Sequence, residues 1–132
     1  MKYLSEYVEK RQTALFKELG IFFACDQKQF EEQEVKGVEY VGLPMQMVCP
    51  KKNVKGYLLR HPKLIAEGMA EDLKDNGMKG IIHRELGNHE AYYTYSIEDT
   101  VGHLAGYGFT REQVQAEFGN YCRAHEEWEA SQ

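Results

Sequence analysis

Residues 21–49, IFFACDQKQFEEQEVKGVEYVGLPMQMVC, decide the fold class, because the strand-like runs of the chain gather there. The run IFFAC at 21–25 is too short for a helix and rich in strand-forming residues, so we expect a strand buried on both faces. Two further strand-like runs, at 38–41 and 45–49, flank the turn residues GLP and predict a hairpin. Together these segments predict a small, mainly antiparallel three-stranded sheet near the N-terminus.

Helical patterns precede and interrupt this stretch. Residues 4–19 place apolar side chains on one face at helical spacing, which predicts an amphipathic helix. Gly20 predicts its end, since glycine readily adopts the left-handed conformation that closes many helices. Asp26 stands in the N-cap position of a short helix expected at 27–33, with Phe30 facing inward.

The sequence after residue 51 is typical of helices to its end. Asn53 is a candidate cap for a helix that begins at Val54. Pro62 should break or kink this helix, because proline removes a backbone donor and clashes with the preceding turn. Gly77, after Asn76, predicts its end. The apolar residues that share one face of this segment are Leu58, Ile65, Met69 and Leu73.

Three more helices are predicted in the last third of the chain. The first is expected at 78–93. The second is expected at 97–105, preceded by a capping box that starts with Ser96, and the third follows a capping box at 110–113. Their inward stripes are Met78, Ile82, Leu86, His89 and Tyr93 in the first, and Val114, Phe118, Tyr121, His125 and Trp128 in the last. Strands early and helices late predict an α+β fold rather than alternating βαβ units.

Length and composition narrow the class of protein. The chain of 132 residues is expected to form a single domain over 1–132. A formal net charge of −5 argues against a general nucleic-acid binder, which is usually basic. No apolar run approaches the roughly 20 residues of a membrane helix, and no secretory signal is visible. We therefore expect a cytoplasmic protein that needs no cofactor.

The three cysteines form no CxxC pair. Cys25, Cys49 and Cys122 are separated by long gaps, so the zinc and thioredoxin signatures are absent. We expect reduced thiols that act as small hydrophobic side chains. Cys25 closes the apolar run at 21–25, where burial would make its thiol inert.

The sharpest candidate for chemistry is HRELGNHEAYY at 83–93. Glu85 and His89 are four residues apart, on one face of a helix, and Glu90 follows directly. Two carboxylates and an imidazole could bind a divalent metal or share proton transfer. The spacing is not HExxH, so a metal would need a ligand from another helix, such as His61, His103 or His125. The alternative is that His89 lies at the edge of the core, hydrogen-bonded to a carboxylate or carbonyl.

Two other surfaces are candidates for binding. The polar and aromatic residues Asn88, Tyr92, Tyr93 and Tyr95 are typical of protein interfaces, where an apolar ring and a polar tip both help. The segment 50–63 contains basic residues and no acidic one, and could contact phosphates or simply form a solvated face near acidic segments. Its basic residues are Lys51, Lys52, Lys55, Arg60 and Lys63.

Four blocks of the sequence resemble a family of small proteins of unknown function from bacterial phage and conjugative elements. FFACDQKQFEEQ at 22–33 is similar to its block FFAFSxxQFxEG, and GLPMQMVCPKKNVK at 42–55 resembles GMGxxCPKxN. IIHRELGNHEAYYTYSIEDTV at 81–101 resembles IIxRELxNHExxYTGDIxDxV, and GYGFTREQVQ at 106–115 resembles GYGxTxEEVQ. The resemblance implies a cytoplasmic protein of a mobile element and no particular activity, cofactor or partner.

These observations lead to three functional hypotheses. The first is a non-enzymatic accessory module that binds another protein through the region of Tyr92–Tyr95. The second is a metal-dependent or acid–base enzyme that uses Glu85, His89 and Glu90. The third is a weak nucleic-acid contact through 51–63, which the acidic composition makes the least favoured. We expect a protein partner and no membrane association.

Overall fold

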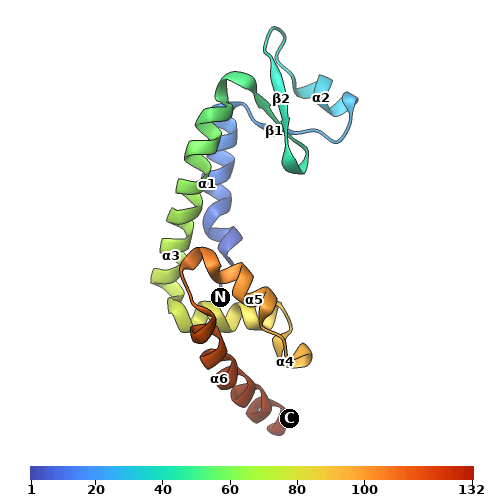
Figure 1. Cartoon of the computed structure of the whole chain (residues 1–132). Helices are drawn as coiled ribbons and strands as arrows, with labels where there is room; N and C mark the ends of the chain where they lie inside the picture. Colours follow the sequence, from blue (N-terminus) through green and yellow to red (C-terminus); the bar gives the residue numbers. More distant parts are fainter. The chain divides into compact units, whose positions relative to one another are not determined.

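The computed structural model describes all residues from 1 to 132 and has an α+β fold, 74% helical, with one small sheet (Figure 1). The chain divides into two compact units, one formed by Lys2–Ala70 and the other by Glu71–Gln132 together with Met1. Each unit contains a hydrophobic core of its own. The sheet lies wholly in the first unit.

The three-stranded antiparallel sheet is confirmed. Its strands β1 (Phe22–Phe23), β3 (Met47–Pro50) and β2 (Tyr40–Leu43) lie in that order, and β2 and β3 form the predicted hairpin around the short 3-10 turn η1 (Pro44–Gln46). The expectation of a strand buried on both faces at 21–25 is wrong. β1 is a two-residue edge strand, and the side chain of Phe23 is 50% exposed. A sheet this small has too little protein around it to cover both faces.

The first unit is built on two helices that pack side by side (Figure 1). Helix α1 (Leu4–Leu19) has the predicted bounds and ends at Gly20 with φ 73°. It packs against the first part of α3 (Val54–Asn88). A Cβ atom at Gly68 would lie 2.6 Å from Val8 Cγ2, so glycine is what allows the two helices to approach there. The short helix α2 (Gln27–Gln33) is capped by the Asp26 side chain, as predicted.

The close approach at Gly68 also explains an error in the predicted buried face of α3. The shared apolar face of Leu58, Ile65, Met69 and Leu73 is the one that the sequence pattern would turn inward. In the structure Leu58 and Leu73 are exposed, while Ile65 and Met69 are partly buried. The buried residues lie one position earlier, at Tyr57, Leu64, Gly68 and Asp72. A shift of one residue rotates a helix face by about 100°, and it turns Gly68 toward α1.

Helix α3 passes through Pro62 and breaks at Gly77 instead. Of the break or kink expected at Pro62, the break does not occur: the helical conformation continues there, on the exposed side of the helix. Gly77 has φ 70° and ψ 165°, which interrupts the helix at the predicted point. Asn53 lies in the 3-10 turn η2 (Lys51–Asn53). Its side-chain Nδ2 donates a hydrogen bond of 2.7 Å to the backbone oxygen of Leu19 and so connects this turn to the end of α1.

The second unit is helical. It holds the last part of α3 and the helices α4 (Ala91–Thr94), α5 (Glu98–Leu104) and α6 (Arg111–Ala130), with a 3-10 turn η3 (Ala105–Tyr107) before α6. The capping box at 110–113 is confirmed by two reciprocal hydrogen bonds of Thr110 and Gln113. The box expected at Ser96 does not form, because α5 begins at Glu98 with Ile97 as its cap. Ser96 Oγ accepts only a long hydrogen bond of 3.5 Å from the backbone N–H of Glu98. Ile97 is instead used as a core residue.

The predicted stripes of the second unit hold only in the middle of the core. Of their members, Ile82, Leu86 and Val114 are buried, and Phe118 and Tyr121 pack partly buried against the same core. The outer members of the stripes are not: Met78, Tyr93 and Trp128 are exposed, because α3 ends at Asn88 and the end of α6 extends past the core. The cysteines also differ from one another. Cys49 is buried and Cys122 half-buried, whereas Cys25 is exposed, contrary to expectation.

Candidate functional sites

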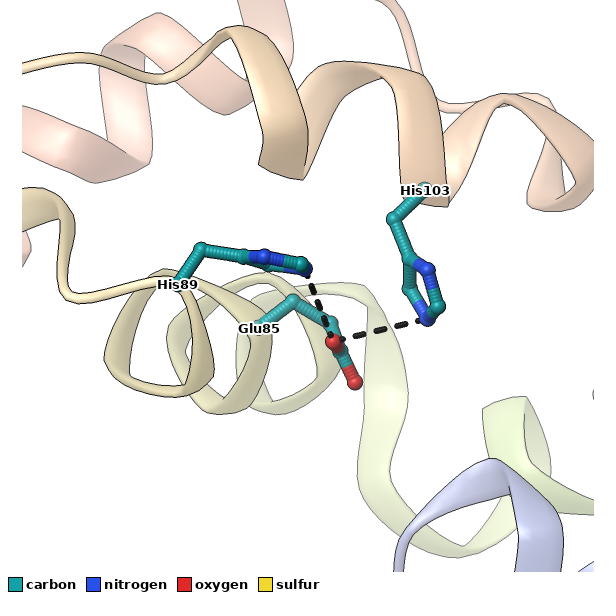
Figure 2. A group of neighbouring side chains, drawn as sticks. All are labelled: Glu85, His89 and His103. Carbon is teal, nitrogen blue, oxygen red and sulfur yellow. Dashed lines mark ion pairs between the residues drawn. The ribbon is translucent and has the colours of Figure 1, made fainter.

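Two histidines converge on one buried carboxylate in the second unit. Glu85 comes from the last turns of α3, His89 directly follows that helix, and His103 comes from α5 (Figure 2). Glu85 Oε2 lies 3.7 Å from His89 Nε2 and 3.6 Å from His103 Nε2. The Glu85 side chain is only 2% exposed, while that of His103 is half-exposed. We call these three residues the Glu85 cluster; their side chains are all of kinds that bind divalent metals.

The other oxygen of Glu85 is held by an arginine. Arg84 Nε donates to Glu85 Oε1 at 2.9 Å. The two terminal nitrogens of Arg84 donate to the two carboxylate oxygens of Asp72, at 2.9 and 3.0 Å. Asp72 also accepts hydrogen bonds from Tyr107 Oη at 2.5 Å and Asn76 Nδ2 at 2.8 Å. This buried network orients Glu85, so that Oε2 is the oxygen directed at the two histidines.

The network also sets the ionisation of its members. Burial by itself would raise the pKa of Asp72, but hydrogen bonds from Arg84, Tyr107 and Asn76 outweigh it and hold the pKa below its ordinary value. Burial and the hydrogen bond to Asp72 raise the pKa of Tyr107. Hydrogen bonds to Asp72 and Glu85 keep the pKa of Arg84 above its ordinary value despite burial. Asp72 is therefore ionised and Tyr107 neutral at neutral pH.

Of the three histidines that the sequence offered as a further ligand, His103 is the one that lies beside Glu85 and His89. His61 contacts the ring of Tyr57 in the first unit, and His125 lies among aromatic rings of α4 and α6. Glu90, the third residue of the predicted constellation, is exposed and is not a member of the cluster. It has a left-handed φ of 53° at the start of α4. Asn88 donates a weak hydrogen bond of 3.4 Å to Glu85 Oε2 and so borders the cluster.

Asp72, Arg84 and Tyr107 were not singled out from the sequence. Asp72 lies four residues after Gly68 on the buried face of α3. An acidic residue at a position that helical spacing assigns to the buried face is the sequence feature that could have identified it. Such a residue needs a partner of opposite charge. The spacing alone does not identify that partner, since Arg84 lies beyond the break at Gly77.

The tyrosines of α4 join side chains of α6 in a second candidate site. The Tyr92 ring lies tilted against His125 with centroids 3.9 Å apart. The rings of Tyr93 and Trp128 also lie close to His125, with centroids at 5.7 and 5.9 Å. Tyr95 lies 6.4 Å from Tyr92. We call these five residues the aromatic face. Tyr93, Tyr95 and Trp128 are 69%, 75% and 59% exposed.

The basic segment is partly neutralised by acidic residues of the same unit. Arg60 forms an ion pair with Glu18 at 2.7 Å, and Lys51 approaches Glu39 at 3.9 Å. Lys52, Lys55 and Lys63 are exposed. Ion pairs within the same unit therefore offset part of the charge of Lys51 and Arg60.

Comparison with known proteins places the chain in a family. The model of a family of unknown function, DUF7659, matches residues 4–124, so the chain belongs to that family. No curated protein and no solved structure matches the chain. None of the helices is both long enough and apolar enough to cross a membrane.

Proposed function

We propose that this protein is a non-enzymatic accessory module that binds a basic segment of another protein through the aromatic face. The observation that carries the proposal is the exposure of three large rings, Tyr93, Tyr95 and Trp128, in one continuous set of ring contacts. Exposed aromatic clusters on a small domain are typical of interaction sites, and tyrosine and tryptophan are enriched at the centres of interfaces.

The charge around the aromatic face favours a basic partner. Glu126, Glu127 and Glu129 lie on the same last turns of α6 as Trp128, and no lysine or arginine follows Arg123. The carboxylates lie near the rings: burial and the charges of Glu129 and Glu126 raise the pKa of Tyr92. A lysine or arginine placed over the rings would gain both cation–π and ion-pair attraction.

We also propose a bacterial cytoplasm as the place of action, in association with a mobile element. The resemblance of four sequence blocks to small proteins of phage and conjugative elements supports this setting. The three free cysteines are compatible with a reducing compartment.

The test is binding of synthetic peptides to the native chain and to the variant Tyr93→Ser/Tyr95→Ser, measured by isothermal titration calorimetry. A peptide rich in lysine and arginine should bind the native protein, and a glutamate-rich peptide of equal length should not. Two exposed cation–π contacts of about 0.5–1 kcal/mol each predict a loss of affinity of roughly tenfold in the double variant. The binding should weaken as salt is added.

Tyr3→Ser is the matched control, because Tyr3 is an exposed tyrosine of the other unit. It should bind the basic peptide as tightly as the native protein does. Equal affinity for the basic and acidic peptides would contradict the charge argument. Unchanged affinity in the double variant would show that the aromatic face is not the binding surface.

A further inference from the structure

We propose that the Glu85 cluster is a binding site for one divalent transition-metal ion of the Zn²⁺ type. The ligand atoms are Glu85 Oε2, His89 Nε2 and His103 Nε2, which all lie within 4.8 Å of one another. In a tetrahedral site with bonds of about 2.0–2.2 Å, ligand atoms lie roughly 3.4 Å apart. The two oxygen–nitrogen distances of 3.7 and 3.6 Å are close to this value.

The same unit contains two histidine–carboxylate pairs that show what a direct contact looks like. His83 Nε2 lies 2.6 Å from Glu117 Oε2, and His125 Nε2 lies 3.1 Å from Glu129 Oε1. Both are hydrogen bonds. In the Glu85 cluster, by contrast, two imidazoles face one carboxylate oxygen and both stop beyond hydrogen-bond distance (Figure 2). Two imidazoles held at this distance from one carboxylate oxygen could share an ion with it.

His89 supplies a second, independent observation. Its Nε2 atom is buried and has no hydrogen-bond partner. The large majority of buried side-chain polar atoms in folded proteins have a hydrogen-bond partner. The backbone amide of His89 is bonded to the Glu85 carbonyl, which keeps the residue close to the end of α3. A metal ion at the cluster would satisfy the otherwise unpaired nitrogen.

The buried charges also favour a cation here. Asp72 and Glu85 are both almost completely buried, and the single guanidinium of Arg84 lies between them. One guanidinium balances one carboxylate, so the pair of carboxylates leaves a negative charge on the side of the histidines. A divalent ion would offset it, and the hydrogen bond from Arg84 to Oε1 restricts Glu85 to binding through Oε2.

The donor set indicates the class of metal. Two imidazoles and one carboxylate suit zinc, iron, nickel or copper, whereas calcium and magnesium take oxygen ligands. Three protein ligands leave a position for water, and the 50% exposure of His103 opens the cluster to solvent. The site is independent of the proposed partner binding, which depends on Tyr93 and Tyr95.

The experiment is a calorimetric titration of Zn²⁺ into the full chain after treatment with a chelator, beside Mg²⁺. Zn²⁺ should bind with one ion per chain, and Mg²⁺ should give no comparable heat. His103→Ala should raise the dissociation constant at least about 100-fold, because loss of a ligand costs more than loss of an outer partner, which typically costs 10–100-fold. His103 is half-exposed, so this variant should keep its fold, which circular dichroism would verify.

Two controls separate this site from accidental binding. His61→Ala removes a histidine of the other unit and should leave the Zn²⁺ affinity unchanged. The absorption spectrum of the Co²⁺ form should show nitrogen and oxygen ligation without a thiolate charge-transfer band, which excludes the exposed Cys25. Zn²⁺ binding that survives His103→Ala, a thiolate band, or heats no larger than those of Mg²⁺ would overturn the proposal. The last result would identify the cluster as a histidine–carboxylate contact that binds no metal.

Discussion

Asp72 is the residue on which the buried polar network depends. Its two carboxylate oxygens accept from Arg84, Tyr107 and Asn76, and its side chain has no exposed surface. A carboxylate can be buried in this way only when its hydrogen-bonding capacity is met. The stability of the second unit should therefore be sensitive to each donor, including the distant Tyr107.

Tyr107→Phe tests this dependence with a minimal change. It removes the hydroxyl that donates to Asp72 and leaves the ring that stacks on Phe109. Hydrogen bonds to charged groups contribute about 1.5–3 kcal/mol, so the free energy of unfolding should fall by that amount in urea titrations. Tyr95→Phe removes the hydroxyl of an exposed tyrosine and should change it by less than about 0.5 kcal/mol. Equal effects of the two substitutions would contradict the assigned role of Tyr107.

The members of the Glu85 cluster could be predicted only in part from the sequence. Glu85 and His89 could be proposed together because helical spacing places residues four apart on one face. His103 could be named only as one of three histidines, since its approach to Glu85 depends on how α5 packs on α3. Glu90 was a reasonable neighbour by sequence, but the chain turns into a left-handed conformation there and the residue leaves the helix face.

At the scale of elements, the break in α3 is the most specific backbone feature. Gly77 combines φ 70° with ψ 165°, a region of conformational space that is essentially open only to glycine. The sequence predicted this break because glycine after asparagine is a common helix end. The prediction of a helix break at Pro62 is wrong, because the loss of one backbone donor on an exposed face is not enough to end the helix.

Gly77→Ala should therefore destabilise the second unit. Strain in this backbone region costs about 1–3 kcal/mol, and the free energy of unfolding should fall by that amount in chemical denaturation. Gly102→Ala is the matched control, because Gly102 lies inside α5 with open space where a Cβ would be. It should stabilise by roughly 0.5–1 kcal/mol through the higher helix propensity of alanine. Two changes of the same sign would contradict the strain argument.

Elements with strong local signals were predicted well. Helix α1 has its predicted bounds, and the caps at Asp26 and Thr110 form as expected, because each depends on a few neighbouring residues. The strands were found, but their ends and exposure were not, since short strands are defined by pairing with distant segments. The buried face of α3 was wrong by one residue, because the packing of α1 at Gly68 decides it.

In the molecule as a whole, every carboxylate whose pKa is shifted has it lowered from the ordinary value. Hydrogen bonds from Arg60, Arg111 and His83 lower the pKa of Glu18, Glu98 and Glu117, and that of Asp72 is also lowered. These residues come from both units. A carboxylate whose pKa is lower in the folded than in the unfolded chain stabilises the fold above its unfolded pKa. That contribution is lost as pH falls through the folded value.

These carboxylates should therefore make the free energy of unfolding fall below about pH 4.5, the ordinary pKa of glutamate. Urea midpoints measured between about pH 6 and pH 3 would show this decline. Tyr107→Phe should have a shallower decline, because the folded pKa of Asp72 moves back toward 3.8 when a donor is removed. Parallel curves for the two proteins would show that Asp72 does not contribute to the acid dependence.

Trp128 is the single tryptophan of the chain, and it lies on the aromatic face rather than in either core. The intrinsic fluorescence of the protein therefore originates at the surface that we propose to bind a partner. A basic peptide that covers the indole would shift its emission to shorter wavelength, while loosening of the cores would leave the spectrum of an already hydrated ring nearly unchanged. The protein thus carries its own optical reporter for binding, without any added label.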